Sequence, residues 1–380
     1  MKEVGKIKDA CIVIAGQSPK GSSYNENREG LEFHQGKKAF GESIIEHSNV
    51  WTTEITKIAE PGDILMSVRA PVGPTNITDR KICIGRGLAA IRCKGNIIPQ
   101  YILYALRNIE SRIIGNDGAV FNSINKKQIE DLPLPLLPLS EQQSIVDYLD
   151  SAFAKIDAMK ANAEKALNES KALFQASLKE MLEPKEGWVT STLKDEYFQI
   201  TDGTHQTPKY FQTGYIFLSS KNVTTRKIDW INVKFIDESQ HQIMHKRVAP
   251  KVGDILLAKN GTTGVAAMVD RDVVFDIYVS LALLRSKGNV TPDYLLAFVN
   301  SPIAKEQFNK RLIGMGVPNL HLGEINKVVI TYPIDKEEQA KVTKKIEELD
   351  YQIIRLQENY DKISQECDAL KQAILRQVFE

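Results

Sequence analysis

A Gly-Asp-Ile-Leu segment occurs twice in the chain, as PGDILMSVRAPVG at residues 61–73 and as VGDILLAKNGTTG at residues 252–264. Two further segments recur in the same order. NIIPQYILYALRN (96–108) returns as NVTPDYLLAFVNS (289–301), and KALFQASLKEMLE (171–183) returns as DALKQAILRQVFE (368–380). Collinear matches at a nearly constant offset indicate an internal repeat. The chain is therefore predicted to contain two copies of one unit, residues 1–183 and roughly 187–380.

Each copy begins with a globular part and ends in a long helix. The globular part is rich in Gly, Pro and short β-like runs such as ACIVIA and GLAAIRC. In the helix, apolar residues follow one another at alternating steps of four and three, which is the pattern of a heptad seam. The seam residues predicted for the pairing of the two helices are Ile145, Leu149, Ile156, Met159, Val342, Ile346, Ile353 and Leu356.

These boundaries predict four segments: globular residues 1–140, a helix at 141–186, globular residues 187–335, and a helix at 336–380. The expected fold class is mixed α+β, with two pseudo-symmetric globular domains separated by a long two-helix coiled coil. An antiparallel helix pair is favoured over a parallel one, because two copies of one unit pair most simply through an isologous contact.

Composition points to an ordinary globular protein. The 380 residues are 42% apolar and 26% charged, and 49 Lys and Arg against 48 Asp and Glu leave a net charge of +1. The excess of positive charge lies in the globular segments, with 18 basic and 15 acidic residues in 1–140 and 17 and 14 in 187–335. The four cysteines are far apart in the sequence, and no apolar run reaches membrane-spanning length. A soluble cytoplasmic protein is expected.

Sequence patterns for catalysis are incomplete. GQSPKG (16–21) has the spacing of a phosphate loop but lacks the lysine that should follow it. His241 and His245 stand four residues apart, with no third ligand apparent nearby, so a surface histidine pair is expected and not a metal site. Neither a Gly-x-Ser-x-Gly elbow nor the Pro-Pro-aromatic motif of adenine methyltransferases is present. The sequence predicts no catalytic residues, no bound metal and no cofactor.

Polar loops occupy matching places in the two copies and supply the candidate binding residues. Lys, Arg, Asn, Ser and Thr side chains can bond both phosphates and base edges. The candidates in the first copy are Lys20, Ser22, Tyr24, Asn25, Arg28 and Arg69. Those in the second copy are Thr204, His205, Lys209, Tyr210, Lys221, Asn222, Arg226, Lys259 and Asn260.

Three motifs carry a resemblance to a known family. They are the segment from Thr201 to Leu218 (TDGTHQTPKYFQTGYIFL), the two Gly-Asp-Ile-Leu strands, and LPLLPLSEQQSI (134–145), a Pro-rich lead into a Glu-Gln helix. The second copy departs from the last motif, because its YPIDKEEQAKV (332–342) has one proline and ends in valine. Across nearly its whole length, the chain resembles the specificity (S) subunit of type I restriction-modification systems.

The resemblance implies DNA recognition without catalysis. Each globular domain would be a target-recognition domain that reads one half of a bipartite double-stranded DNA site, and the helices would set the distance between the halves. The implied partners are modification (methylase) subunits, two in number, and restriction subunits with translocase and nuclease activity. S-adenosylmethionine, ATP and Mg²⁺ would be bound by those partners. Two alternatives stay open: a two-headed coiled-coil scaffold that binds only proteins, and, less favoured, an adenine DNA methyltransferase.

Overall fold

The repeated Gly-Asp-Ile-Leu segment forms a buried strand in each half of the chain, β7 (Ile64–Ser67) and β16 (Ile255–Ala258). Gly62 and Gly253 precede these strands, and both have φ near +87°. Glycine reaches this left-handed region without the steric cost that a Cβ would add. The same sequence therefore produces the same tight turn into the same central strand.

The aspartate of the repeated segment closes this turn. In the first half, the Asp63 carboxylate accepts a hydrogen bond from the Glu60 backbone N–H (2.8 Å) and pairs with Arg92 (2.7 Å). In the second half, Asp254 accepts from the backbone N–H of Lys251 (2.8 Å) and pairs with Arg285. Each arginine comes from the neighbouring strand of the sheet. The repeated Asp therefore has a structural role, joining a turn to the strand beside it.

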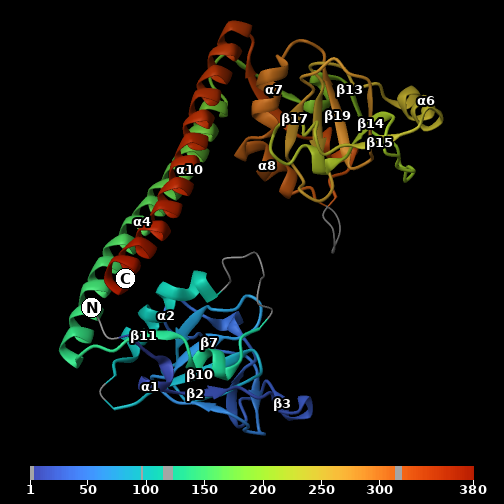
Figure 1. Ribbon diagram of the computed structural model, residues 1–380. Coiled ribbons are helices and arrows are strands. Elements are labelled where there is room, and N and C mark those ends of the chain that lie inside the picture. Colours follow the sequence, from blue (N-terminus) through green and yellow to red (C-terminus); the bar gives the residue numbers. More distant parts are fainter. Residues whose placement is uncertain (1–3, 96, 114–122, 313–318) are drawn as a thin grey trace. The chain divides into compact units, whose positions relative to one another are not determined.

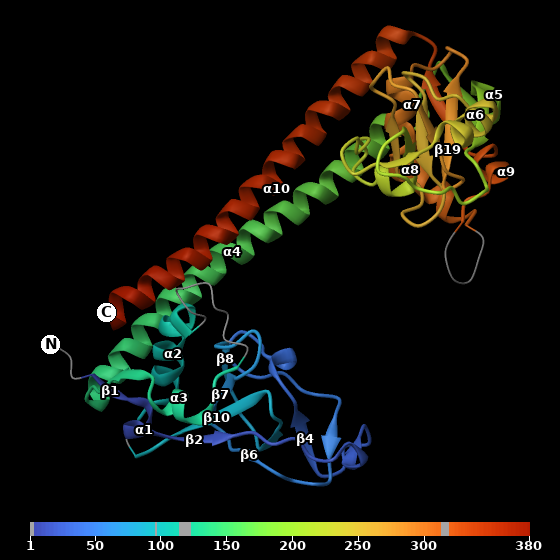
Figure 2. The ribbon, with the colours of Figure 1, turned by 45° about the vertical axis from the view of Figure 1, so that its right-hand side comes forward.

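The computed structural model describes residues 4–95, 97–113, 123–312 and 319–380. The chain forms two compact units. Unit 1 contains residues 1–163 and 361–380, and unit 2 contains residues 164–360. Each unit combines a globular domain with one end of each long helix, as Figure 1 and Figure 2 show.

Unit 1 has a four-stranded antiparallel sheet in the order β2-β10-β7-β8 and a five-stranded sheet in the order β3-β5-β4-β9-β6. In the second sheet β4 and β9 are parallel. A short ribbon pairs β1 with β11. The strands are β1 (Val4–Lys6), β2 (Cys11–Ala15), β3 (Tyr24–Asn25), β4 (Leu31–His34), β5 (Trp51–Thr52), β6 (Ile58–Ala59), β8 (Thr75–Ile77), β9 (Ile82–Ile84), β10 (Leu88–Cys93) and β11 (Pro133–Pro135).

Unit 2 repeats this topology with a smaller second sheet. Its four-stranded sheet has the order β13-β19-β16-β17, its three-stranded sheet the order β15-β14-β18, and its ribbon pairs β12 with β20. The pair β14 and β18 is parallel, as β4 and β9 are in unit 1. The strands are β12 (Trp188–Thr192), β13 (Tyr197–Asp202), β14 (Tyr215–Leu218), β15 (Lys234–Ile236), β17 (Ala266–Met268), β18 (Phe275–Ile277), β19 (Leu281–Ser286) and β20 (Val329–Pro333).

Helices cover one face of each four-stranded sheet. In unit 1, α2 (Pro99–Ile113) packs on β7 and β8, and in unit 2, α7 (Pro292–Val299) packs on β17. The shorter helices are α1 (Ile7–Ala10), α3 (Lys126–Glu130), α5 (Leu193–Glu196), α6 (Glu238–Arg247), α8 (Pro302–Asn309) and α9 (Leu322–Ile325). None of the described helices is long and apolar enough to cross a membrane.

The two long helices are α4 (Leu139–Leu182) and α10 (Lys336–Phe379), each of 44 residues. They pair antiparallel. In unit 1 the start of α4 packs on the end of α10, where Phe153 and Ile156 share a buried cluster with Cys367. In unit 2 the end of α4 packs on the start of α10, where Leu178 shares a cluster with Ile346. The predicted antiparallel pair and the α+β fold class are confirmed.

The heptad seam differs from the predicted one at one predicted residue in each helix. Leu149 and Ile156 are buried, but Met159 is 60% exposed and Leu356 is 40% exposed, so their placement in the seam is wrong. From Leu149 the buried stripe steps by four to Phe153, because the Phe153 ring packs edge-on against Tyr104 with centroids 5.5 Å apart. The remaining seam residues of the prediction, all buried or half-buried, are Ile145, Val342, Ile346 and Ile353.

Polar side chains take the places that the one-residue shift opens. Lys160 lies 3.2 Å from Asp368 in unit 1, and Lys171 donates to Gln357 at 2.7 Å in unit 2. Lys371 pairs with Asp157 and also lies 5.5 Å from the centre of the Phe153 ring. The seam is therefore a mixed one, in which amphipathic side chains pack their stems and pair their charged ends.

Two buried glutamines fasten the long helices to their domains. Gln142 accepts from the Ile98 backbone N–H (3.0 Å) and donates to the Leu137 carbonyl (2.8 Å). Gln339 does the same in unit 2, accepting from the Thr291 N–H (2.8 Å) and donating to the Pro333 carbonyl (2.8 Å). The glutamine of the Glu-Gln pair near the start of each long helix is therefore explained by these hydrogen bonds between helix and domain.

Candidate functional site

Five of the predicted contact residues of unit 1 lie on one segment between β2 and β4: Lys20, Ser22, Tyr24, Asn25 and Arg28. The side chains of Lys20, Ser22 and Arg28 are exposed. Asn25 is held inside the segment, because its amide donates to the Glu29 carbonyl and accepts from the Glu29 N–H, each at 3.0 Å. Asn25 thus shapes the turn in which Arg28 adopts φ +65°, and it is not free to bind a ligand.

Two clefts open beside this segment. The first has a volume of about 740 Å³ and is lined by Tyr24, which stacks on Phe33 with ring centroids 4.9 Å apart. The second, of about 720 Å³, is lined by Arg28. The sequence analysis missed four further basic side chains that line these clefts, and only their positions in the folded domain identify them: Lys38, Arg80, Lys81 and Arg86.

A buried carboxylate supports the second cleft. Glu32 is 3% exposed, and Arg80 donates to both of its oxygens at 2.8 Å. His34 and His47 lie 2.8 and 3.2 Å from the same carboxylate, and the Ser48 N–H donates to it at 2.7 Å. Burial alone would raise the pKa of Glu32, but these donors outweigh it and hold the pKa well below its usual range.

Arg69 lies at the end of β7, in the loop that leads to β8, and its side chain is exposed. Its backbone bridges to Ser123, and the preceding residue, Val68, donates its N–H to the Gly87 carbonyl at 3.0 Å. Gly87 directly follows Arg86, which lines the first cleft. The chain path therefore brings Arg69, after the end of β7, near Arg86, which precedes the start of the neighbouring strand β10.

In unit 2 loops that carry several of the predicted contact residues meet around Asp202, which is 3% exposed. Its carboxylate pairs with Lys259 (2.8 Å), Arg247 (2.8 Å) and His205 (3.2 Å). Burial by itself would raise the pKa of Asp202, but the Lys259 and Arg247 charges lower it below the usual range. Lys259 was predicted to contact DNA. Its side chain is only 7% exposed and its ammonium group is paired with the Asp202 carboxylate, so that prediction is wrong.

Thr204 and Asn222 are also supporting residues and not contact residues. Thr204 is 8% exposed, and its hydroxyl accepts from the Gln206 N–H at 3.2 Å. Asn222 is 7% exposed, and its amide accepts from the Ser219 N–H (2.9 Å) and donates to the Asn232 carbonyl (3.1 Å). Buried polar groups are normally satisfied in this way within a fold. Both predictions are corrected on these grounds.

The outward-facing candidates of unit 2 are His205, Lys209, Tyr210 and Lys221, all of them exposed. The Lys234 ammonium group lies 5.7 Å from the centre of the Tyr210 ring. It adds a lysine to this group of side chains beyond those that were predicted. Asn260 is half-buried and forms a backbone bridge with Asn319.

Arg226 lies beside the long helix α10. Its guanidinium lies 3.6 Å from the Asp350 carboxylate of α10, and it lines a cavity of about 260 Å³ beside Phe174 and Ile346. Its side chain is 42% exposed. The structure therefore places Arg226 against the helices, apart from the group around Asp202.

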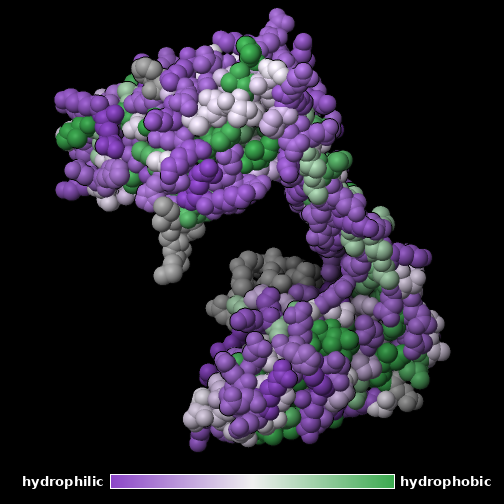
Figure 3. Space-filling view, turned by 180° about the vertical axis from the view of Figure 1, so that it is seen from behind, coloured by the Kyte–Doolittle hydropathy of each residue, from purple (hydrophilic) through white to green (hydrophobic). Residues whose placement is uncertain are grey.

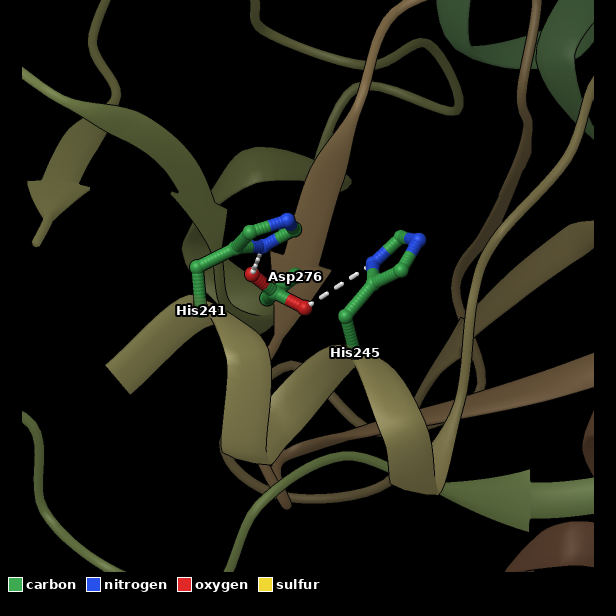
Figure 4. Close-up of side chains that lie close together, drawn as sticks. All are labelled: His241, His245 and Asp276. Carbon is green, nitrogen blue, oxygen red and sulfur yellow. Dashed lines mark hydrogen bonds and ion pairs between the residues drawn. The ribbon is translucent and has the colours of Figure 1, made fainter. Parts of the chain in front are cut away.

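The histidine pair of α6 is not the isolated surface pair that the spacing suggested. Asp276 of β18 lies between the two rings, with Oδ2 2.7 Å from His241 Nδ1 and Oδ1 3.2 Å from His245 Nδ1 (Figure 4). His241 is 9% exposed and Asp276 1%. Burial raises the pKa of Asp276, against the opposing effect of the two imidazoles. The third group comes from 31 residues further along the chain, which explains why spacing missed it.

The surface drawn in Figure 3 is mostly hydrophilic on both units, and its hydrophobic residues occur in small groups. Exposed lysine, arginine, histidine and tyrosine side chains on loops are suited to hydrogen-bonding phosphates and base edges and to stacking. The same scaffold presents a different set of such side chains in each unit. What the arrangement offers chemically is binding and discrimination.

Comparison with known proteins identifies the family. Residues 2–169 and 185–365 each match the family described as type I restriction modification DNA specificity domain. The chain belongs to this family. Its two specificity domains coincide with the two copies of the repeat, so the resemblance found in the sequence is confirmed. The match favours DNA specificity over the protein-only scaffold and the adenine methyltransferase.

Curated relatives of this specificity family are similar over part or most of the chain. The MjaX specificity subunit of Methanocaldococcus jannaschii is 40% identical over 169 residues, which are 44% of this chain and 39% of that protein. The MjaVIII specificity subunit of the same organism is 25% identical over 370 residues, 92% of this chain and 86% of that protein. The EcoKI specificity subunit of Escherichia coli is 23% identical, and the match covers 60% of it.

Two solved structures share the fold. A chain from a type I restriction-modification system, solved to explain its complex assembly and conformational transition, has a TM-score of 0.77 and 16% identity. That match covers 100% of this chain and 97% of the other. The HsdS subunit from Thermoanaerobacter tengcongensis has a TM-score of 0.56 and 15% identity, covering 99% and 96% of the two chains. At these identities the likeness concerns the fold.

Proposed function

We propose that this chain is the DNA-recognition subunit of a type I restriction-modification complex. Residues 1–140 and 187–335 are the two target-recognition domains, and each reads one half of a bipartite double-stranded DNA site. One observation carries the proposal: the specificity family matches both copies of the repeat, so one chain holds two specificity domains.

The two half-sites differ in sequence under this proposal. The first domain offers Lys20, Arg28 and Arg69 with the ring of Tyr24, while the second offers His205, Lys209 and Lys221 with the ring of Tyr210. The planar arginine fork is suited to bidentate bonds to guanine, whereas lysine presents a compact point charge on a flexible stem. Different side chains on one scaffold therefore predict independent readout of two sequences.

Catalysis belongs to the partners in this proposal. The chain would act without a cofactor of its own, while two modification subunits bring S-adenosylmethionine and restriction subunits bring ATP and Mg²⁺. The helices α4 and α10 would set the distance between the half-sites and help to dock these subunits. The cytoplasmic location expected from the sequence is part of the same proposal.

The test is a binding assay with the chain and its cognate modification subunits on a library of randomised DNA, at several fixed salt concentrations. We expect enrichment of one bipartite sequence that binds roughly 10³-fold or more tightly than random DNA. Exchange of residues 187–335 for those of another family member should change one half-site and leave the other intact. Binding without sequence preference at every salt concentration would refute the proposal.

A further inference from the structure

Three side chains of the types that bind metal ions lie close together in unit 2, apart from the loops around Asp202. His241 and His245 stand four residues apart on α6, so both imidazoles project from one face of that helix. Asp276 on β18 faces them, and one potential ligand atom from each residue lies within 4.8 Å of the others. Figure 4 shows the carboxylate between the two rings.

Charge balance separates this cluster from the similar cluster in unit 1. Glu32 also faces two histidines, but Arg80 adds a permanent positive charge at 2.8 Å. Among the residues that the structure describes, Asp276 has no arginine or lysine partner, although its side chain is 1% exposed. A buried carboxylate needs a compensating cation. Unit 2 has the carboxylate and the two imidazoles without the fixed cation.

The three side chains lie near enough to one another to reach a common zinc ion after small side-chain movements. Zinc binds imidazole nitrogen and carboxylate oxygen at about 2.0–2.2 Å, and in a tetrahedron of that size the ligand atoms stand about 3.3 Å apart. The His245 Nδ1 to Asp276 Oδ1 separation of 3.2 Å is of this size, although each histidine contacts a different oxygen of Asp276. The His241 Nδ1 to Asp276 Oδ2 separation of 2.7 Å would have to open by about half an ångström. One carboxylate oxygen would have to turn toward both rings, and the three ligand atoms, which lie within 4.8 Å of one another, would have to close to about 3.3 Å.

The surroundings hold the ligands and leave a route to them. Tyr215 of β14 stacks on the His241 ring, with centroids 3.8 Å apart and planes 8° apart, which fixes the ring's orientation. Asp237 caps α6 by accepting the Gln240 N–H at 2.9 Å, so the helix begins at a defined residue. The His245 side chain is 31% exposed, and an ion could enter on that side.

We propose that His241, His245 and Asp276 bind a single Zn²⁺ ion, with water as the fourth ligand. Two imidazoles and one carboxylate are a donor set that zinc accepts in proteins, and an open fourth position completes a tetrahedron. The ion would fasten α6 to β18. Because Arg247 on the same helix pairs with Asp202, the ion would also steady the loops that carry His205 and Lys209.

The experiment measures metal in the full-length chain. The protein is stripped with chelator, incubated with Zn²⁺ or Co²⁺ and dialysed, and the metal per chain is measured by mass spectrometry. Visible absorption of the Co²⁺ form reports the coordination geometry. We expect about one ion per chain, a tetrahedral Co²⁺ spectrum, and a higher melting temperature in the presence of Zn²⁺. Thermodynamic linkage requires that stabilisation if the folded state alone binds the ion.

Variants locate the ion. His245→Ala and Asp276→Asn should weaken Zn²⁺ binding by more than the roughly 10–100-fold that loss of a supporting residue costs. His321→Ala is the matched control, because His321 is an exposed histidine of the same unit. Circular dichroism checks that each variant folds. The number of zinc ions per wild-type chain tests the site even if a variant does not fold. A wild-type chain that retains no ion, or ions that remain after both substitutions, would overturn the site and leave a hydrogen-bonded cluster.

Discussion

Buried carboxylates organise the candidate DNA-contact loops at the scale of single residues. Asp202 in unit 2 gathers Lys259, Arg247 and His205, and Glu32 in unit 1 gathers Arg80 with two histidines. Neither acid faces outward, and each determines which neighbouring cations remain free. In unit 2, Lys259 forms an ion pair with the buried Asp202 carboxylate. The side chains of Lys209 and Lys221 are exposed and remain candidates for contact with DNA. A lysine in a recognition loop is therefore a contact candidate only if no internal carboxylate holds it.

Substitution of two lysines should separate these roles. Lys20→Met is expected to weaken binding to all DNA sequences about equally and to lower the salt dependence of log K by about one unit. Lys259→Met leaves Asp202 without its most buried partner, so it should cost about 3 kcal/mol of stability, the low end for breaking a buried pair. Binding titrations across salt concentrations and denaturant melts measure the two effects. Lys251→Met, at an exposed lysine, is the stability control, and a loss of salt dependence in Lys259→Met would contradict the assignment.

The pH dependence of stability should report on Glu32. Its folded pKa lies below the unfolded value of about 4.3, so its contribution is fully present above that value and is lost progressively as the pH falls from there toward the folded pKa. Wild-type stability should therefore decrease between about pH 5 and pH 3. Glu32→Gln should be less stable at pH 7 and should show a smaller decrease on acidification. Glu26→Gln, at an exposed glutamate, should behave like wild type, and equal acid dependence in all three chains would count against the network.

At the scale of elements, side-chain size decides which face of each long helix is buried. The sequence offers two apolar stripes that share Leu149 and Ile156 and differ by one residue in between. The stripe through Phe153 is buried because that ring reaches Tyr104, and Met159 is left outside. Gln142 and Gln339 then fix where each helix leaves its domain, through bonds to the backbone of a neighbouring segment.

Two alanine substitutions in α4 should distinguish the buried stripe from the exposed one. Ile156→Ala removes a side chain that is 5% exposed, and it should cost roughly 2–5 kcal/mol by leaving a cavity. Met159→Ala removes a side chain that is 60% exposed, and it should change stability by no more than about 0.5 kcal/mol. Urea denaturation of both variants measures the difference. Similar losses of stability in the two variants would show that Met159 is buried in the seam, as the sequence predicted.

At the scale of the whole molecule, duplication gives one chain two recognition domains joined by two helices of equal length. Each unit contains one end of both helices, so neither domain is complete without a part of the chain distant in sequence. The proposed function assigns the helices a further role, as the spacer between half-sites. Because both helices have 44 residues, a change of length must be made in both to keep the seam in register.

Insertion of three heptads into both helices should lengthen the preferred DNA spacer. Twenty-one residues add about 32 Å of helix, while a DNA turn is about 34–36 Å. The insertion therefore preserves the heptad phase and returns the second half-site to nearly the same face of the DNA. We expect the optimal spacer to grow by nine or ten base pairs, with both half-sites unchanged, in a methylation assay on sites of varied spacer length. A folded, assembled variant that keeps the original spacer would show that something else sets the distance.

The sequence alone determined the duplication, the α+β class, the antiparallel helix pair and the family, because these depend on recurring local patterns. Gly62 and Asp63 recur as Gly253 and Asp254, and the same backbone turn follows from the same residues. Heptad periodicity likewise identifies a helix, although it predicted a buried Met159, and only the fold showed that Phe153 is buried and Met159 exposed.

Only the tertiary structure decided which polar residues face outward. Lys259 and Lys209 look alike in the sequence, and their difference arises because Asp202, 57 residues before Lys259, lies beside one of them. Asp276 of strand β18 completes the cluster with His241 and His245 of helix α6 for the same reason. Burial and ion pairing depend on what the fold brings near each side chain, and strands far apart in sequence supply those neighbours.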